Sequence, residues 1–453
     1  MIPEHIFRAY DIRGVYGTDL TEEIATRIGR ALASYVDGEG KSMLVGRDVR
    51  LSSPPIGDAL IKGLLAGGFD VEDIGTVTTP ILYFSSVNYG RNGGVMVSAS
   101  HNPPEWNGFK IWLETGFICQ GKGMEELKAI ALKGRFKESA GGRLKRNPNA
   151  IADYENHVAK RIDVERRMKV AADPGNGSCC LLIPRVFRKV GIDVAAINAE
   201  PDGSFPARPP DPTEEVLGGL KRLVLDEKAD FGVGFDGDGD RAVFVDDLGR
   251  MVPSDLILVM LTEFYLKRQK GVAVVYEVSC SLNVEETVKA CGGKPVLSQV
   301  GHTYIVDKML KEKAVLGGET SGHFYFADMY GFDDALFAGL KVAEILSKTG
   351  MKLSEILDSL PKYPRIPIKN YECPDEKKFR VVEELAEDFR RMGYETVTID
   401  GVKVVEDEGW LLIRPSNTQP LIRLTVEAKN KEALQRLAQF AEEKITEKIK
   451  KCR

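Results

Sequence analysis

The sequence has no hydrophobic run long enough to cross a membrane and no excess of basic charge. Its longest apolar stretches, such as Leu256–Leu261, are far shorter than the roughly 20 residues that a membrane helix needs. The N-terminal residues lack the basic stretch and apolar core of a secretory signal. The formal net charge of −5 gives no electrostatic reason to expect nucleic acid or an anionic membrane surface as a partner. We therefore expect a cytoplasmic protein that binds neither.

Cysteine is scarce and scattered. The seven cysteines show no paired C-x-x-C spacing, so the sequence does not indicate a zinc site. Their odd number and irregular spacing favour a reducing compartment over a disulfide framework. They lie at Cys119, Cys179, Cys180, Cys280, Cys291, Cys373 and Cys452.

The length of 453 residues exceeds what one hydrophobic core serves. Three segments, beginning near Met43, Lys169 and Val272, each repeat an apolar strand, a Gly- or Ser-bearing loop, an amphipathic helix, a glycine and a second strand. This alternation predicts crossover units in mostly parallel sheets. The C-terminal segment instead has a hairpin signal at Asp400-Gly401, further strands and a helix from Lys431. We predict an α/β protein with three similar mixed α/β-sheet domains and a C-terminal α+β domain around a central cleft, divided as 1–148, 149–248, 249–362 and 363–453.

The stretch "FDGDGDRAVFV" carries three aspartates, Asp236, Asp238 and Asp240, that alternate with glycines between apolar strands. Glycines permit a tight backbone path around an ion, and hard oxygen ligands favour Mg²⁺. An EF-hand does not fit, because Arg241 stands where that loop needs glycine and a strand follows in place of a helix. The ordinary alternative is a solvated acidic turn.

The stretch "SASHNPPEWNGFK" places Ser100, His101 and Lys110 directly after an apolar strand. Open α/β sheets present their reactive groups at this edge. The G-x-S-x-G elbow of serine hydrolases is absent. A phosphoryl group on Ser100 would instead supply the ligand that three aspartates leave open. The alternative is a helix N-cap or turn serine.

Three further loops carry candidate binding groups. "GGETSGHF" offers Glu319, Ser321 and His323 to sugar hydroxyls, although glycine-rich loops with one glutamate are common. "RPSNTQP" offers a phosphate the side chains of Arg414, Ser416, Asn417 and Thr418; the alternative is an ordinary turn between strands. "FRAYDIRG" contributes Tyr10 and Arg13, and Arg13 can serve a transferred phosphoryl group, unless it is an ordinary surface arginine.

In this order, the loops resemble the α-D-phosphohexomutase superfamily, and within it the phosphomannomutase/phosphoglucomutase branch. The resemblance extends over nearly the whole chain and also includes "GRD" at Gly46, "DPGNG" at Asp173, "VGHTYI" at Val300 and "GFDDA" at Gly331. It implies four domains around one cleft, with an active phosphoserine at Ser100. It further assigns Mg²⁺ to the three aspartates and the Ser100 phosphate, sugar hydroxyls to Glu319 and Ser321, and the idle phosphate to the Arg414 loop.

The implied reaction moves a phosphoryl group between the 1- and 6-positions of mannose or glucose phosphate through a hexose 1,6-bisphosphate. Arg13, Lys110 and Arg241 are expected to stabilise the transferred group. The candidates for general acid and base are His101, Lys110 and His323. We expect a monomer or homodimer whose partner is a small sugar phosphate.

Two departures from the branch bear on specificity. Many of its members have lysine where this chain has Ser279 and methionine where it has Thr320. Because Ser279 lacks the positive charge of that lysine, we expect His302 to contribute more to the contact with the phosphate or the sugar. The alternatives are a phosphoglucosamine mutase, a Mg²⁺-dependent sugar phosphatase and a non-catalytic sugar-phosphate sensor, although a sensor needs neither a nucleophile nor a metal triad.

Overall fold

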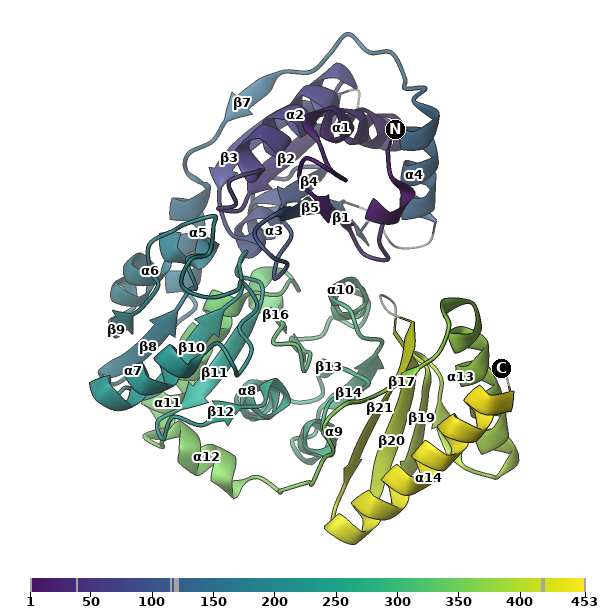
Figure 1. The fold of residues 1–453 in the computed structure, drawn as a ribbon. Helices are drawn as coiled ribbons and strands as arrows, with labels where there is room; N and C mark the ends of the chain where they lie inside the picture. The colour runs from purple at the N-terminus through teal and green to yellow at the C-terminus, as the bar shows by residue number, and fades with distance from the viewer. Residues whose placement is uncertain (1, 38–39, 115, 118–121, 417–419, 452–453) are drawn as a thin grey trace.

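The computed structural model describes residues 2–37, 40–114, 116–117, 122–416 and 420–451. Four sheets follow one another along the chain, and Figure 1 shows their units arranged as an arc, with the purple N-terminal unit at one end and the yellow C-terminal unit at the other. Three of these sheets are mixed and the fourth is antiparallel, as predicted.

The first three sheets share one strand order. In each repeat, the first strand pairs in parallel with the second strand on one side and with the third strand on the other. The fourth strand pairs antiparallel with the third. The repeats consist of β2 (Ser42–Arg47), β3 (Asp70–Thr76), β4 (Gly93–Val97) and β5 (Trp106–Leu113); β8 (Met168–Asp173), β9 (Ile192–Ala196), β10 (Phe231–Phe235) and β11 (Ala242–Asp246); and β13 (Ala273–Glu277), β14 (Lys294–Ser298), β15 (Leu316–Gly318) and β16 (Phe324–Phe326). The shared order confirms three similar α/β units.

Short strands extend these sheets at their edges. The first sheet gains β1 (Ile12–Val15), β6 (Gly116–Phe117) and β7 (Leu144–Arg146), and the second gains β12 (Met251–Val252). In β2, β4 and β10 nearly every residue is buried, as expected for strands covered on both faces.

Helices connect the strands and cover the sheets. The first unit contains α1 (Glu22–Val36), α2 (Ser53–Ala66), α3 (Thr79–Asn88) and α4 (Gly123–Lys133). After α5 (Ala150–Ala159), the second unit contains α6 (Ile183–Lys189) and α7 (Gly218–Glu227). The third contains α8 (Ser254–Arg268), α9 (Leu282–Ala290), α10 (His302–Lys311), α11 (Ala335–Thr349) and α12 (Leu353–Ser359).

One hydrophobic core runs through the first three units. It includes Leu82 of α3, Val233 of β10 and Leu258 of α8, which are completely buried. Helix α11 contributes to this core along almost its whole length, and it contacts β8 and β11 of the second sheet as well as α8. Asp334 caps α11 by accepting a hydrogen bond from the Phe337 N–H at 2.9 Å. The three units are therefore packed against one another.

The C-terminal unit has a separate core. Strands β17 (Lys369–Glu372), β21 (Leu421–Ala428), β20 (Gly409–Pro415), β19 (Val402–Glu406) and β18 (Glu395–Val397) form its sheet in that order, and α13 (Asp375–Arg391) and α14 (Lys431–Lys451) pack against it. The predicted hairpin forms, but β18 ends at Val397, so its connection is longer than Asp400-Gly401. The Asp400 carboxylate is used elsewhere, in the candidate site.

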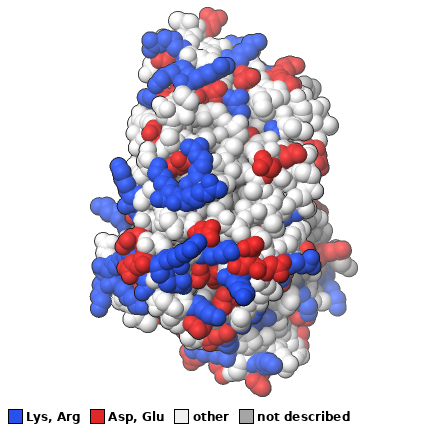
Figure 2. All heavy atoms as spheres, turned by 90° about the vertical axis from the view of Figure 1, so that its left-hand side faces the viewer, with Lys and Arg blue, Asp and Glu red and all other residues white. Residues whose placement is uncertain are grey.

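Charges of opposite sign are interspersed on the outer surface. Figure 2 shows blue and red side chains lying beside one another on the face of the molecule that is at the left of Figure 1. Ion pairs of the second unit include Arg166–Asp230 at 3.1 Å and Lys169–Glu227 at 2.6 Å. Within the described part of the chain, no helix combines the length and the apolar character required to span a membrane.

Candidate active site

Many of the predicted site residues lie on equivalent loops of the three α/β repeats, whereas Arg13 lies on β1, Lys110 on β5 and His302 at the start of α10. Each loop connects the third and fourth strands of its repeat: residues 98–105 between β4 and β5, residues 236–241 between β10 and β11, and residues 319–323 between β15 and β16. Residues 416–420 connect β20 and β21 in the C-terminal unit. The same edge of each repeat therefore presents its own set of polar side chains.

Ser100 points from the first loop toward the second unit. Its backbone has a φ of +52°, in the left-handed region that non-glycine residues rarely adopt, and the residue is 1% exposed. Its Oγ donates a hydrogen bond to Asp236 Oδ2 at 2.9 Å, and its N–H donates to Ser98 Oγ at 2.8 Å. An unusual backbone conformation thus places the hydroxyl beside the acidic loop.

The three aspartates of the second loop converge. Asp236, Asp238 and Asp240 are at most 2% exposed, and each offers an oxygen within 4.8 Å of the others. Asp238 Oδ1 and Asp240 Oδ1 are buried and have no hydrogen-bond partner among the described residues. Buried oxygens of this kind need a partner, and a hard divalent cation provides one. The cluster is an acidic triad that can hold a metal ion.

Lys110 and Thr79 of the first unit hold the same triad. Lys110 Nζ lies 2.7 Å from Asp238 Oδ2 and 2.5 Å from Asp240 Oδ2. Burial alone would lower the pKa of Lys110, but these carboxylates outweigh it and raise that pKa. Thr79 Oγ1, at the start of α3, donates to Asp238 Oδ2 at 2.6 Å. Asp238 is thereby fixed through one oxygen while the other remains open.

The carboxylates of the triad differ in their electrostatic environment. Burial, together with the charges of Asp240 and Asp238, raises the pKa of Asp236 well above its usual value. Burial also opposes ionisation of Asp240, but Lys110 outweighs it, aided by His323 and Arg241, and holds the pKa of Asp240 well below its usual value. The first unit therefore supplies much of the positive charge that keeps the triad together.

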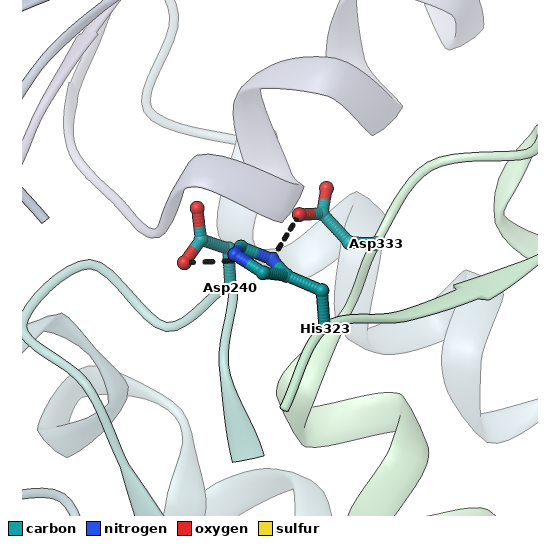
Figure 3. Close-up of side chains that lie close together, drawn as sticks. All are labelled: Asp240, His323 and Asp333. Carbon is teal, nitrogen blue, oxygen red and sulfur yellow. Dashed lines mark hydrogen bonds and ion pairs between the residues drawn. The ribbon is translucent and has the colours of Figure 1, made fainter. Parts of the chain in front are cut away.

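His323 connects the sugar loop to the triad (Figure 3). Its Nδ1 lies 2.6 Å from Asp333 Oδ2 and 4.0 Å from Asp240 Oδ1. Arg241 Nε donates to His323 Nε2 at 2.9 Å, a hydrogen bond that forms with the neutral ring, whose proton is then on Nδ1. Burial lowers the pKa of His323, but Asp240 and Asp333 outweigh it and raise that pKa above its ordinary value.

His101 and Arg13 flank the serine. Arg241 and burial lower the pKa of His101 to about 2, with Arg13 and Lys110 contributing, so its imidazole is neutral at physiological pH. Arg13 donates from Nε to Asp11 Oδ2 at 2.7 Å and from Nη1 to Asn102 Oδ1 at 2.5 Å. Arg13 is therefore held against the serine loop by two side chains.

The sugar loop of the third unit is partly open to solvent. Glu319 is buried and accepts a hydrogen bond from the Gly301 N–H at 3.1 Å and another from the Tyr325 hydroxyl. Burial raises the pKa of Glu319. Ser321 is exposed. Between Gly318 and Gly322, the sugar loop therefore carries one buried group, Glu319, and one group that faces solvent, Ser321.

Tyr10 and His302 lie where the first and third units meet. The Tyr10 hydroxyl donates to the Val300 carbonyl at 3.2 Å, and its ring centroid lies 6.2 Å from that of His302. The His302 ring also lies 6.1 Å from that of His323, and His302 Nε2 is buried without a hydrogen-bond partner among the described residues. His302 therefore has an open ring nitrogen near the triad.

The C-terminal unit contributes Arg414, near the end of β20, and Ser416, directly after that strand. Asp400 Oδ2 lies 2.9 Å from Arg414 Nη2 and accepts the Val300 N–H at 3.0 Å, so Asp400 joins the third and fourth units. Arg414 Nε is buried without a hydrogen-bond partner among the described residues, and Ser416 is buried. Asn417 and Thr418 lie outside the described residues.

Several residues of the site carried no assigned role in the sequence analysis. Asp333 belongs to the quoted "GFDDA" motif, whereas Thr79 and Asp400 had only the general pattern of a helix start and a turn. Glu277, at the end of β13, accepts hydrogen bonds from Ser279 Oγ at 2.5 Å and Thr320 Oγ1 at 2.7 Å. The two departures from the family pattern are thus neighbours joined by one buried carboxylate.

Comparison with known proteins assigns this arrangement to a class. Models of the four phosphoglucomutase/phosphomannomutase domains match the chain in order: α/β/α domain I at residues 4–138, domain II at 152–249, domain III at 253–363 and the C-terminal domain at 368–444. These matches cover most of the sequence. The chain belongs to the phosphoglucomutase/phosphomannomutase family, a family of sugar-phosphate mutases, and has its four-domain fold.

Individual relatives are similar over their full length. A phosphoglucomutase/phosphomannomutase of Thermococcus kodakarensis is 35% identical, covering 98% of this chain and 99% of the relative. A probable phosphoglucosamine mutase of Pyrococcus abyssi is also 35% identical, with the same coverage. The crystal structure of a phosphoglucomutase/phosphomannomutase family protein from Burkholderia thailandensis is 34% identical and superposes with a TM-score of 0.92, covering 99% of this chain and 98% of that structure.

Proposed function

We propose that this chain transfers a phosphoryl group between the 1- and 6-positions of a hexose phosphate, mannose and/or glucose, through phosphorylated Ser100 and a hexose 1,6-bisphosphate. The observation that carries the proposal is the Ser100 hydroxyl, buried 2.9 Å from Asp236 Oδ2. A nucleophile that touches a carboxylate triad is suited to phosphoryl transfer, which depends chiefly on positioning and charge stabilisation.

The residues of the triad fit a divalent cation. Asp236, Asp238 and Asp240, together with the phosphate on Ser100, would hold Mg²⁺, which supplies charge stabilisation to the phosphoryl oxygens when it is bound. The open Oδ1 atoms of Asp238 and Asp240 support this assignment. Lys110, Arg13 and Arg241 are the chain's own cations near the serine, and their task is to stabilise negative charge on the transferred group.

The cycle requires the substrate to bind in two orientations. After Ser100 donates its phosphoryl group, the bisphosphate reverses so that its other phosphate can return to the serine. Arg414 and Ser416, with Asn417 and Thr418, would hold the idle phosphate, while Glu319 and Ser321 would bind ring hydroxyls in both orientations. His302, Tyr10 and the proton carrier, chosen from His101, Lys110 and His323, complete the proposed set.

Addition of hexose 1,6-bisphosphate tests the reaction class. We expect traces of glucose 1,6-bisphosphate to stimulate conversion of mannose 1-phosphate or glucose 1-phosphate to the 6-phosphate, with almost no release of inorganic phosphate. Intact-mass spectrometry should find one phosphate on Ser100. Stoichiometric release of inorganic phosphate without isomerisation would identify a phosphatase instead.

The substrate needs a direct comparison. Because the Pyrococcus abyssi relative is a probable phosphoglucosamine mutase, glucosamine 1-phosphate is a second candidate substrate. Rates with mannose, glucose and glucosamine 1-phosphates, measured side by side, decide among the three.

The division of the chain into domains at residues 148, 248 and 362 remains our prediction. It keeps each four-stranded repeat within one domain, while β12 pairs across the second division with β11. A cytoplasmic monomer or homodimer likewise remains a prediction.

A further inference from the structure

Arg50 lies beneath the loop that carries Ser100. The residue is 0% exposed, and each of the five N–H donors of its guanidinium group has an acceptor. One donor faces the carboxylate of Asp48, three face backbone carbonyls of the serine loop, and one faces the carbonyl of Trp106, the first residue of β5. The acceptors are Asp48 Oδ2 at 3.0 Å, Pro103 O at 2.5 Å, Trp106 O at 3.1 Å, Ser100 O at 2.7 Å and Asn102 O at 2.7 Å.

Arg50 is itself held from two sides. Asp48 Oδ1 accepts hydrogen bonds from the Arg50 N–H at 3.0 Å and from Ser53 Oγ at 2.5 Å, which fixes the carboxylate against α2. On the other side, the ring of Phe205 from the second unit covers the guanidinium, with its centroid 5.2 Å from Arg50 Cζ. The buried charge is therefore paired and shielded from water.

We propose that Arg50 is a positioning residue for the nucleophile. By binding the Ser100 carbonyl and three later carbonyls, it keeps the loop in the one shape that gives Ser100 its φ of +52° and directs the hydroxyl to Asp236. Its donors are all used, so Arg50 acts on the loop and not on the phosphate. The inference rests on the proposed role of Ser100 as the phosphorylated residue.

The chemistry of the side chain explains why arginine is needed. Four carbonyls that converge on one plane match a planar fork of donors, whereas a lysine ammonium offers three donors on one atom. A misplacement of the reacting group by about 1 Å can reduce a rate about 100-fold. Arg50→Lys keeps the charge opposite Asp48 and removes the fork.

The test compares Arg50→Lys with Arg47→Lys. Arg47 is a matched control because it lies at the end of β2, shortly before Arg50, is also buried, and pairs with Asp73 at 2.6 Å, away from the serine loop. We expect Arg50→Lys to lower kcat about 100-fold and to change KM less than about twofold. Transfer of phosphate from glucose 1,6-bisphosphate to Ser100, followed by mass spectrometry in a single turnover, should slow by the same factor. Arg47→Lys should keep the wild-type rate.

The outcomes separate this inference from the proposed function. If the wild-type protein takes no phosphate on Ser100, the proposed function is wrong. If the wild type is phosphorylated and folded Arg50→Lys reacts at the same rate, or loses affinity without losing kcat, the positioning role is overturned. Should Arg50→Lys fail to fold, Ser53→Ala decides the question. It removes the hydroxyl that donates to Asp48 Oδ1 and accepts from Asn107 Nδ2 at 3.0 Å, while Asn107 keeps its hydrogen bond to Ser52 Oγ at 2.8 Å. We expect kcat to fall about fivefold with KM unchanged. An unchanged kcat in Ser53→Ala then refutes the inference.

Discussion

The serine and metal loops are held differently from the sugar loop, although all three occupy the same position in their repeats. Arg50 binds the serine loop, and Arg208 donates to the Phe235 carbonyl at 2.8 Å directly before the metal loop. Each of these arginines is buried against an aspartate that ends or follows the first strand of its repeat. In the third repeat, Glu277 ends that strand and accepts hydrogen bonds directly from Thr320, and no arginine within the described part of the chain forms an ion pair with it.

This difference distinguishes the two loops that carry the reacting groups from the loop that is expected to bind the sugar. Ser100 and the three aspartates are buried in a network that leaves little freedom, whereas Thr320 and Ser321 are exposed. A reacting hydroxyl gains from a fixed position, but a loop that meets a hexose in two orientations needs groups that solvent and substrate can both reach. We therefore expect changes in the first two loops to lower kcat, and changes at Ser321 of the sugar loop and at Arg414 of the fourth unit to raise KM.

The largest effect is expected for Ser100→Ala. Without the hydroxyl no phosphoserine forms, so kcat should fall by roughly four to six orders of magnitude while substrate binding stays nearly intact. Steady-state rates and isothermal titration with glucose 1-phosphate measure the two quantities. Ser98→Ala, which removes a hydroxyl from the same loop, should lose less than about tenfold. Retention of most activity in Ser100→Ala contradicts the assignment.

The metal loop is tested by Asp238→Asn. The amide removes one negative charge. With its oxygen still accepting from Lys110 Nζ and Thr79 Oγ1, its NH2 group takes the place of the open Oδ1, so we expect Mg²⁺ affinity to fall about 100-fold and activity to recover only partly at high Mg²⁺. Thr79→Val, which removes only the hydrogen bond at 2.6 Å to Asp238, should cost about tenfold. Asp226→Asn, on the exposed face of α7, is the control. Mg²⁺ dependence that is unchanged in Asp238→Asn excludes the triad as the metal site.

Recognition of the idle phosphate is tested by Arg414→Lys. Lysine cannot bind a phosphate through two parallel N–H donors, so we expect KM for glucose 1-phosphate to rise about tenfold while kcat changes less than about twofold. Arg436→Lys, at an exposed position on α14, controls for a general effect of the substitution. A fall in kcat with unchanged KM would place Arg414 with the chemistry and remove the contrast between the loops.

Local pattern predicted the repeats better than it predicted the contacts between them. Strand and helix alternation marked all three α/β units, and the alternating aspartates marked a loop whose carboxylates do converge. The contacts of Thr79 with Asp238 and of Asp400 with Val300 join residues far apart in the sequence, and nothing local distinguishes those side chains from an ordinary helix start or turn. Arg50 is a similar case: the "GRD" motif drew attention to Asp48, but the role of Arg50 appears only when the loop folds over it.

The smallest effect concerns the contact between the third and fourth units. Lys403 donates to the Val278 carbonyl at 2.8 Å, lies 4.2 Å from the centroid of the Trp410 ring and is 8% exposed. Burial lowers the pKa of Lys403 to about 8, although Cys280, Glu277, Glu285 and Glu427 oppose the shift. The pKa of a lysine in the unfolded chain is about 10.4. Between these two pKa values the unfolded chain binds more protons than the folded one, so the contribution of Lys403 to stability rises with pH, by at most about 1.4 kcal/mol for each pH unit.

Lys403→Met should lack that rise of stability with pH. Urea unfolding of both proteins at pH 7.5 and 9.5 measures it, with exposed Lys267→Met as the control, and equal pH dependence in Lys403→Met and wild type would show that the buried amine does not titrate in this range. Because Lys403 lies at the interface and not in a site loop, kcat at pH 7.5 should stay within about twofold of the wild-type value.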